Sequence, residues 1–286
     1  MRQSSFRAPH REAPSSGAGT FSQEHRDMGM NRVTILGSGT VVPSLLRSSC
    51  SVLIEYGESK LVFDLGAGTM RRLLEAGAAV SEVTHLFFSH LHPDHTGEFV
   101  SFLFATKYPE TYRRRTPFRI IGARGLLAFY EKLKAVYGEW VTLEEGLMRI
   151  VELNASGPDR LPLGKIEILS LPMRHIASSI GYRVQLPGGF SVAYSGDTDF
   201  CENLIELAKG ADLFICESAL PDEQKVAGHL TPSLAGEVAT RAGARRLVLT
   251  HFYPECDTAD IEGQCRRSYS GPLVLAQDLM SFEIPS

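Results

Sequence analysis

The sequence of 286 residues predicts an α/β fold built as a single domain. From Arg32 onward, short runs rich in β-branched and aromatic residues alternate with helical patterns. The alternation forms two mixed halves of similar length with no low-complexity linker between them. The composition, 43% hydrophobic and 22% charged, is that of an ordinary globular protein. We therefore expect one sandwich-like α/β domain over residues 28–286.

Residues 1–27 differ from the rest of the chain in composition. They are rich in Ser, Arg, Pro and Gly, and they lack the apolar run of a secretory signal. We expect them to form a flexible tail that precedes the domain.

The first half begins with the expected strand Val33-Thr34-Ile35-Leu36, which ends at Gly37-Ser38-Gly39. A hairpin is expected around Gly57-Glu58, because two strand-like runs flank this turn. The further strands expected in this half are 51–55, 60–63, 83–89 and 118–121, and the helices are 70–76, 97–108 and 125–137.

The second half repeats this alternation. Thr231 is a suitable N-cap for a helix, with Pro232 at the first helical position. The expected strands are 166–170, 180–185, 190–195, 213–216, 247–250, 273–276 and 281–284, and the helices are 202–209, 231–241 and 257–266.

Charge and cysteine content limit the functional classes. With 29 basic and 33 acidic residues, the net charge of -4 argues against a dedicated nucleic-acid binder. No run approaches the roughly 20 apolar residues of a membrane span, so no membrane partner is expected. Five cysteines without a C-x-x-C pair indicate free thiols, and we expect a cytoplasmic protein.

The segment that directly follows the expected strand 83–89 carries the strongest chemical signal. His90, His92, Asp94 and His95 fall within six residues. Imidazole and carboxylate are typical ligands of zinc and similar metals. Because one backbone segment cannot aim all four groups at a single centre, the spacing favours two ions, about 3.5 to 4 Å apart. We expect two divalent ions, with Zn²⁺ as the first choice and Mn²⁺ or Fe²⁺ as alternatives.

Further ligand types follow three later strands. His175 lies just past the strand 166–170, Asp197 follows 190–195, and His251 follows 247–250. A single His or Asp at such a place is usually a cap or turn residue. Three of them, in a chain that already has the cluster, indicate ligation, and the carboxylate of Asp197 could bridge two ions.

These residues resemble the motifs of the metallo-β-lactamase superfamily. His90, His92, Asp94 and His95 match its H-x-H-x-D-H motif, and His175, Asp197 and His251 stand at its three later ligand positions. Asp64, in Val62-Phe63-Asp64-Leu65-Gly66, matches the acidic residue that opens the family pattern and supports the ligand loop. The resemblance implies a four-layer αββα sandwich with the metals at one edge, between the two halves.

Within the superfamily, the chain is most similar to the RNase Z group of phosphodiesterases. The segments that carry this similarity are Leu36-Gly37-Ser38-Gly39-Thr40, Gly181-Tyr182-Arg183 and His229-Leu230-Thr231. The resemblance implies that His229 assists proton transfer to the leaving group. Glu217, at the end of the strand 213–216, is either its hydrogen-bond partner or a simple strand-end carboxylate. The resemblance also brings the expectation of a homodimer.

Two departures from the RNase Z pattern concern the substrate. His175 and Asp197 are only 22 positions apart, which leaves no segment for the arm that grips transfer RNA in that group. Tyr253 stands after His251-Phe252 where a serine is typical. Together with the net charge, these departures favour a smaller phosphodiester over a tRNA precursor. The basic run Arg113-Arg114-Arg115 is read as a solvated loop, with a steering patch for an anionic substrate as the alternative.

The resulting hypothesis is a binuclear phosphodiesterase in which metal-activated water attacks phosphorus. His90, His92 and His175 would hold one ion, Asp94, His95 and His251 the other, and Asp197 would bridge them. Asp94 would also orient the water or accept its proton, and His229 would act as general acid. The substrate stays open between an RNA, a cyclic nucleotide and a small phosphodiester.

Three other functions compete with this hypothesis. Another ester class, such as a lactone, thioester or sulfate ester, would use the same fold and metals. Redox diiron relatives resemble H-x-E-x-D, with glutamate where this chain has His92. A non-catalytic metal-binding scaffold would lack some ligands, whereas all seven positions are filled here.

Overall fold

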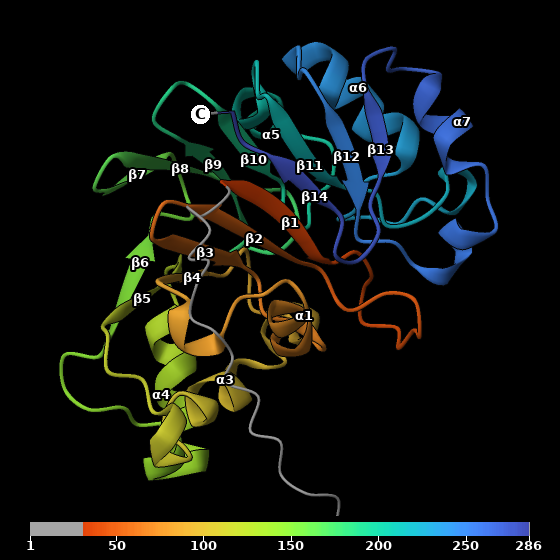
Figure 1. The fold of residues 1–286 in the computed structure, drawn as a ribbon. Helices are drawn as coiled ribbons and strands as arrows, with labels where there is room; N and C mark the ends of the chain where they lie inside the picture. Colours follow the sequence, from red (N-terminus) through yellow and green to blue (C-terminus); the bar gives the residue numbers. More distant parts are fainter. Residues whose placement is uncertain (1–30, 286) are drawn as a thin grey trace, which may run out of the picture.

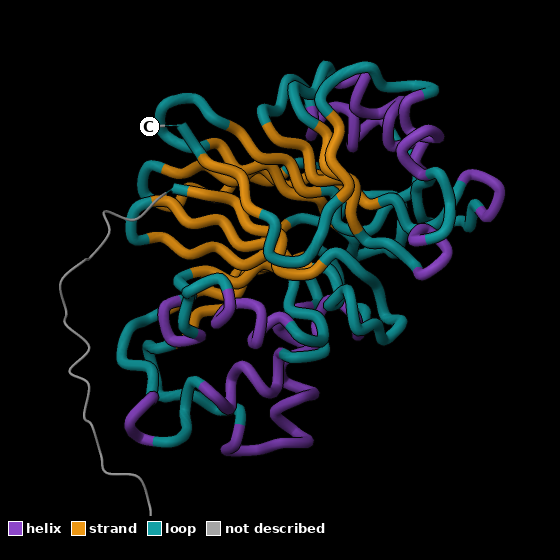
Figure 2. Tube along the Cα trace, turned by 45° about the vertical axis from the view of Figure 1, so that its right-hand side comes forward, coloured by secondary structure: helices purple, strands orange, loops and turns teal. Residues whose placement is uncertain are grey.

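The computed structural model describes residues 31–285 and places two mixed sheets face to face, with helices on both outer faces (Figures 1 and 2). This is the predicted αββα sandwich. The predicted tail, residues 1–27, lies outside the described residues, as do residues 28–30 and 286. Within the described part, no helix combines the length and the apolar character needed to cross a membrane.

The first sheet contains seven strands over the described residues. Its antiparallel part comes first and is followed by the parallel pairs β3–β4, β4–β5 and β5–β6. The strands in spatial order are β14 (Ser281–Glu283), β1 (Arg32–Gly37), β2 (Ser51–Tyr56), β3 (Ser59–Phe63), β4 (His85–Phe87), β5 (Phe118–Ala123) and β6 (Met148–Leu153).

The second sheet has the same plan, with an antiparallel meander followed by three parallel pairs. Its strands in spatial order are β13 (Leu273–Leu275), β12 (Leu247–Thr250), β11 (Leu213–Glu217), β10 (Ser191–Tyr194), β9 (Ile180–Gln185), β8 (Ile166–Pro172) and β7 (Asp159–Leu163).

The helices cover the outer faces of the two sheets (Figure 1). Those of the first half are α1 (Thr69–Glu75), α2 (Pro93–Thr96), α3 (Phe99–Ala105) and α4 (Leu126–Tyr137), with the short 3-10 helices η1 (Val80–Glu82), η2 (Glu110–Tyr112) and η3 (Gly138–Trp140). Those of the second half are α5 (Glu202–Ala208), α6 (Pro232–Ala242) and α7 (Ile261–Arg266), with η4 (Asp222–Gln224) and η5 (Pro254–Asp257).

Two buried apolar layers hold these parts together. The larger layer lies between the sheets and includes Phe63, Phe87 and Tyr182, and it continues beneath α5 and α6. The smaller layer lies between the first sheet and its helices, where Phe88 packs edge-on against Phe99 at 5.2 Å. The alternation of apolar side chains along strands such as β4 therefore supplies both layers from one sheet.

The structure differs from the predicted elements in several places. Strands β6 and β7 were not predicted, and Pro162 in β7 argues against a strand by pattern. Because β7 is an edge strand of its sheet, the missing N–H of Pro162 is tolerated there. The predicted strand 83–89 is shortened to β4, and the predicted helix 97–108 is shortened to α3, which the separate short helix α2 precedes. Strand β14, from the end of the chain, joins the first sheet instead of the second.

Candidate metal centre

The loop after β4 places the motif at the carboxyl end of the parallel strands of the first sheet. His90 lies three residues past the end of this strand, whereas Asp94 and His95 lie in the short helix α2. His92 is the N-cap of α2 and Pro93 is its first residue. Only Phe88 and Ser89 lie between the end of β4 and His90, so the strand fixes the position at which the motif begins.

The structure brings all seven predicted metal-ligating residues together from both sheets. Ligand atoms of His90, His92, His175 and Asp197 lie within 4.8 Å of one another. The same is true of Asp94, His95 and His251, which form a second group. These groups agree with the division expected from the sequence.

Asp197 lies between the two groups. Its Oδ1 is 3.3 Å from Nε2 of both His95 and His251, and its Oδ2 is 3.6 Å from Nε2 of His90. Oδ2 is also 3.9 Å from Nε2 of His175. Each oxygen of one carboxylate therefore faces a different histidine group, as a bridging ligand would.

Several polar atoms of this cluster are buried without a hydrogen-bond partner among the described residues. They are Nε2 of His90, Nε2 of His95, Oδ1 of Asp197 and both ring nitrogens of His251. Buried polar atoms without a partner are rare and costly in proteins. A cation between His95, His251 and Oδ1 of Asp197 would satisfy three of these five atoms, and a cation at the other group would satisfy Nε2 of His90. The donor set of five imidazoles and two carboxylates fits Zn²⁺, Mn²⁺ or Fe²⁺.

The electrostatics of the cluster also favour bound positive charge. Burial lowers the pKa of His90 to about 2, so its imidazole is neutral, the form that binds metal. Burial acts in the same direction on His95, but the carboxylates of Asp197 and Asp64 raise the pKa of His95 well above its usual range. Two buried carboxylates thus favour positive charge at His95, carried either by a proton or by a bound cation.

Asp64 holds the motif through hydrogen bonds to Ser89 and His95, in keeping with the supporting role that the resemblance implies for this residue. Its Oδ2 is 2.8 Å from Nδ1 of His95 and accepts hydrogen bonds from Tyr194 Oη at 2.6 Å and Ser89 Oγ at 2.7 Å. Its Oδ1 accepts the backbone N–H of Ser89 at 2.7 Å. The network fixes His95 so that Nε2 points toward Asp197. Tyr194 and Ser89 were not predicted, although each lies within three residues of a predicted ligand.

His175 is oriented by backbone rather than by a carboxylate. Its Nδ1 is 2.9 Å from the carbonyl oxygen of Gly228, which leaves Nε2 for the metal centre. Gly228 has a φ of 88°, and a Cβ there would lie 2.9 Å from Nδ1 of His175. Only glycine combines this conformation with such a close approach.

His229 lies beside the cluster and is paired with Glu217. Its Nδ1 is 3.0 Å from Oε1 of Glu217, which decides between the two sequence interpretations of that carboxylate. Glu217 also accepts the backbone N–H groups of Thr198 at 2.8 Å and Leu230 at 3.1 Å, so it ties the Asp197 loop to the His229 loop. Burial lowers the pKa of His229, but the hydrogen bond and charge of Glu217, together with Asp197, raise it to about 9. Asp197, His229 and His251 also form a group with ligand atoms within 4.8 Å, so geometry alone permits His229 as a ligand.

The basic run of residues 113–115 does not form a steering patch. Arg114 is buried, with 2% of its surface exposed, and donates to the carbonyl oxygens of Val80 and Val83. Arg113 pairs with Glu110 and Glu144, and Arg115 also pairs with Glu110. All three arginines are thus engaged in hydrogen bonds or ion pairs with nearby residues of the first half.

A pocket of about 490 Å³ opens beside His175. It is formed by residues 176–178 together with Arg124, Asn154 and Ser156, at the carboxyl ends of β5 and β6. Arg124 has no carboxylate within 4.0 Å among the described residues, so its charge is available to a ligand in this pocket.

Comparisons with known proteins agree with this architecture. Residues 61–252 match the family described as the β-lactamase superfamily domain. An uncharacterized protein of Mycobacterium tuberculosis is 32% identical over 251 residues, covering 85% of this chain and 88% of the relative. Ribonuclease Z of Methanothermobacter thermautotrophicus is 30% identical over 302 positions, covering 89% of this chain and 97% of that enzyme.

Among solved structures, the metallo-β-lactamase fold protein YhfI of Bacillus subtilis superposes with a TM-score of 0.75 at 22% identity, covering 88% of this chain and 99% of that one. This likeness shows the fold. The family match extends over more than half of the chain and includes the whole histidine cluster. The chain therefore belongs to the β-lactamase superfamily, has the metallo-β-lactamase fold and is a metal-dependent hydrolase of the ribonuclease and phosphodiesterase type.

Proposed function

We propose that the protein is a binuclear phosphodiesterase whose substrate is smaller than a tRNA precursor. The observation that carries this proposal is the position of Asp197, whose Oδ1 and Oδ2 face different histidine groups at 3.3 and 3.6 Å. His90, His92 and His175 would hold one ion, and Asp94, His95 and His251 would hold the other. Asp197 would be shared between them.

When bound, divalent ions at these two positions supply Lewis acidity that activates water and neutralises charge on phosphoryl oxygens. Asp94 is suited to orient the attacking water or to accept its proton. Burial raises the pKa of its carboxyl, but the hydrogen bond and charge of His251, with the charge of His95, lower this pKa to about 2. Asp94 is therefore ionised at neutral pH and can ligate a cation or accept a hydrogen bond from the attacking water.

His229 is suited to donate a proton to the leaving oxygen. Its pKa of about 9 keeps the imidazole protonated at neutral pH, and Glu217 fixes the ring through Nδ1. Nε2 then remains as the donor toward a substrate. A general acid at this place is what departure of an alkoxide from phosphorus requires.

The size of the substrate is inferred from what surrounds the centre. All residues between His175 and Asp197 belong to the loop 176–179, to the hairpin of β9 and β10, and to its connections. The 302 positions aligned with ribonuclease Z exceed the 286 residues of this chain, so that enzyme has segments without a counterpart here. The net charge of -4 and the pocket beside His175 agree with a small phosphodiester.

The first experiment measures bound metal and hydrolysis of bis(p-nitrophenyl) phosphate. We expect two equivalents of metal and turnover for the wild type, and a loss of both in Asp197→Ala. Glu58→Ala, in the exposed turn between β2 and β3, is the matched control and should behave as the wild type. A folded protein that shows no phosphodiesterase activity in added zinc or manganese would overturn the proposal.

A substrate panel then tests the class of ester. We expect hydrolysis of cyclic nucleotides or other small phosphodiesters and little cleavage of a tRNA precursor. Preferred hydrolysis of a lactone, a thioester or a sulfate ester would assign the chain to that class instead. Cleavage of tRNA precursors at comparable efficiency would refute the inferred substrate size.

A further inference from the structure

A second cleft lies at the other end of the parallel strands from the metal centre. It has a volume of about 510 Å³ and opens where β4, β5 and β6 begin, against the turn that joins β7 to β8. Its walls thus come from both sheets. A volume of this size is typical of sites for small organic ligands. His85 at the start of β4 lies five residues before His90, about 16 Å along an extended chain.

Three cationic or titratable side chains form a row across this cleft. His85 is the register partner of Arg119 on β5, and Arg119 is the register partner of Arg149 on β6. Register partners in neighbouring strands point to the same face of the sheet, and the strands are about 4.8 Å apart. All three residues line the cleft, so their side chains share one wall.

This row carries positive charge that the protein does not neutralise. Within residues 31–285, neither Arg119 nor Arg149 has a carboxylate within 4.0 Å, and no acidic residue lines the cleft. By contrast, Arg32 pairs with Glu55 at 2.5 Å on the same sheet. Two like charges placed directly opposite each other are destabilising. A pair of unneutralised arginines at register positions is therefore a feature that a bound anion would explain.

His85 adds a hydrogen-bond acceptor to the row. Thr84 Oγ1 donates its single hydrogen to the carbonyl oxygen of Lys60 at 3.0 Å, so it can only accept from Nδ1 of His85 at 2.9 Å. Burial and then the charge of Arg119 lower the pKa of His85 to about 4, so the ring is neutral. With the hydrogen on Nδ1, Nε2 is an acceptor and suits a hydroxyl group of a ligand.

The remaining wall is apolar. Pro162 and Leu163 of β7 line the cleft on the side facing the arginines. Guanidinium groups match phosphate oxygens in a bidentate manner, and two of them on adjacent strands can reach one phosphate. We infer that this cleft binds a small organic phosphate of the nucleoside monophosphate class, with its phosphate on Arg119 and Arg149, a hydroxyl at His85 and its planar body against Pro162 and Leu163.

The inference does not depend on the proposed function, because binding is measured without turnover. The probe is adenosine 5′-monophosphate, titrated calorimetrically into the metal-loaded full chain at fixed ionic strength. Adenosine, inorganic phosphate and malonate are separate probes for the apolar body, the phosphate and a carboxylate. We expect the monophosphate to bind at least tenfold more tightly than each of them.

Variants assign the binding to this cleft. Arg119→Gln combined with Arg149→Gln should weaken binding of the monophosphate at least tenfold. Arg115→Gln removes one charge outside the cleft and should leave binding unchanged. Hydrolysis of bis(p-nitrophenyl) phosphate should stay at the wild-type level in all these variants, because no cleft residue belongs to the metal centre. Equal binding in the double variant and the wild type, or no binding to the wild type, would overturn the inference.

Two further results separate binding from a structural role. Without ligand, Arg149→Gln should not lower Tm, because it removes repulsion from Arg119. A clear fall in Tm would show that the pair serves the fold and would count against the inference. Malonate binding as tightly as the monophosphate would replace the phosphate class by carboxylates and would also refute it.

Discussion

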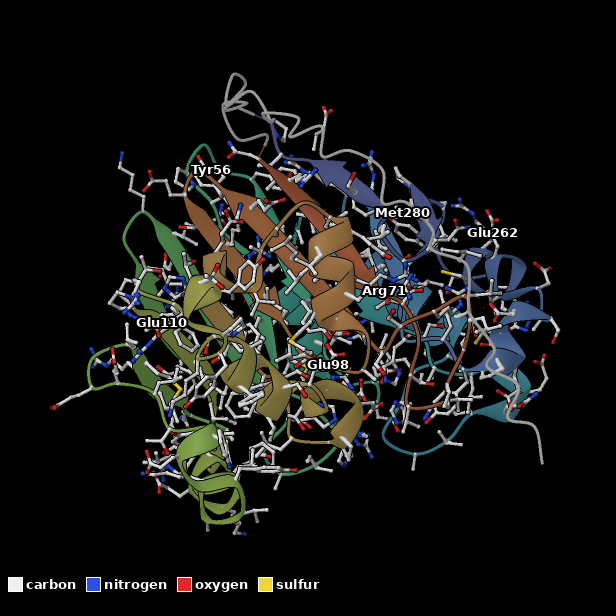
Figure 3. All side chains as sticks on the ribbon, turned by 60° about the horizontal axis from the view of Figure 1, so that its bottom comes forward. Tyr56, Arg71, Glu98, Glu110, Glu262 and Met280 are labelled. Carbon is white, nitrogen blue, oxygen red and sulfur yellow. The ribbon has the colours of Figure 1, made fainter. Side chains whose placement is uncertain are left out.

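Asp64 and His95 are 31 positions apart in the chain, and Oδ2 of the aspartate lies 2.8 Å from Nδ1 of the histidine in a fully buried site. Asp64 has a φ of 60°, an unusual conformation for a residue other than glycine, at the end of β3. The same carboxylate accepts hydrogen bonds from Tyr194 of the second sheet and from Ser89 beside the motif. The Asp64 side chain thus joins both sheets to the candidate metal centre. Figure 3 draws the side chains of the described residues on the ribbon.

Asp64→Asn should weaken metal binding about 10- to 100-fold, because such supporting groups set the orientation and basicity of a ligating histidine. Asparagine tolerates the positive φ, so the change tests the carboxylate and not the backbone. Metal titration of the folded variant, followed with a competing chelator, checks this. Glu58→Gln, at an exposed position, is the matched control. Metal affinity equal to that of the wild type would contradict the expected role of Asp64.

His229→Ala should lower kcat about 10²- to 10⁴-fold with bound metal retained, because it removes the proton donor for the leaving oxygen. The loss should be much smaller for a p-nitrophenyl ester than for an alkyl ester, since p-nitrophenolate departs without a proton. Glu217→Gln should show the same dependence on the leaving group in weaker form, because Glu217 positions His229. Loss of metal in His229→Ala would make this histidine a ligand, and equal losses on both esters would exclude it as general acid.

Arg114→Ala should lower the free energy of unfolding by about 2 to 4 kcal/mol, because buried carbonyl groups lose their donor. The guanidinium donates to Val80 and Val83 at 2.9 and 2.8 Å and lies over the ring of Phe118 at 4.4 Å. Arg115→Ala should change stability by less than about 1 kcal/mol, because its partner Glu110 is exposed. Urea unfolding of both variants gives the comparison. Similar losses in the two would mean that the buried contacts contribute little.

His85→Gln should flatten the dependence of stability on pH between about 6.5 and 4. The folded-state pKa of His85 is lowered to about 4 by burial and by Arg119, so its neutral form is favoured in the native protein. That contribution is fully present above the unfolded pKa of about 6.5 and is lost as the pH falls toward 4. Arg149 on β6 faces the same cleft, whereas Lys60 is paired with Glu55.

The measurement for His85 is urea unfolding of both proteins at several pH values, in one buffer mixture and with EDTA present. EDTA removes the contribution of metal binding, and the difference between wild type and variant cancels the other histidines. Parallel curves for the two proteins would show that His85 stays solvated and protonates freely.

The sequence by itself determined which residues are the candidate ligands. His90, His92, Asp94 and His95 are neighbours in the chain, and His175, Asp197 and His251 each follow a strand that its residues predict. The alternation of strands and helices determined the fold class as well. Local pattern is informative here because the candidate ligands lie within a few residues of strand ends, and strands of this type can be predicted from residue type.

Only the tertiary structure decided which atoms face one another. The two oxygens of Asp197 divide between the histidine groups, and Glu217 reaches His229 across 12 positions. Strand β14 joins the first sheet, and β7 keeps Pro162 because it lies at an edge. Arg114 is buried while Arg115, one residue later, is exposed. These outcomes depend on packing between segments that are distant in the chain. The sequence pattern of one segment does not specify the segment against which it packs.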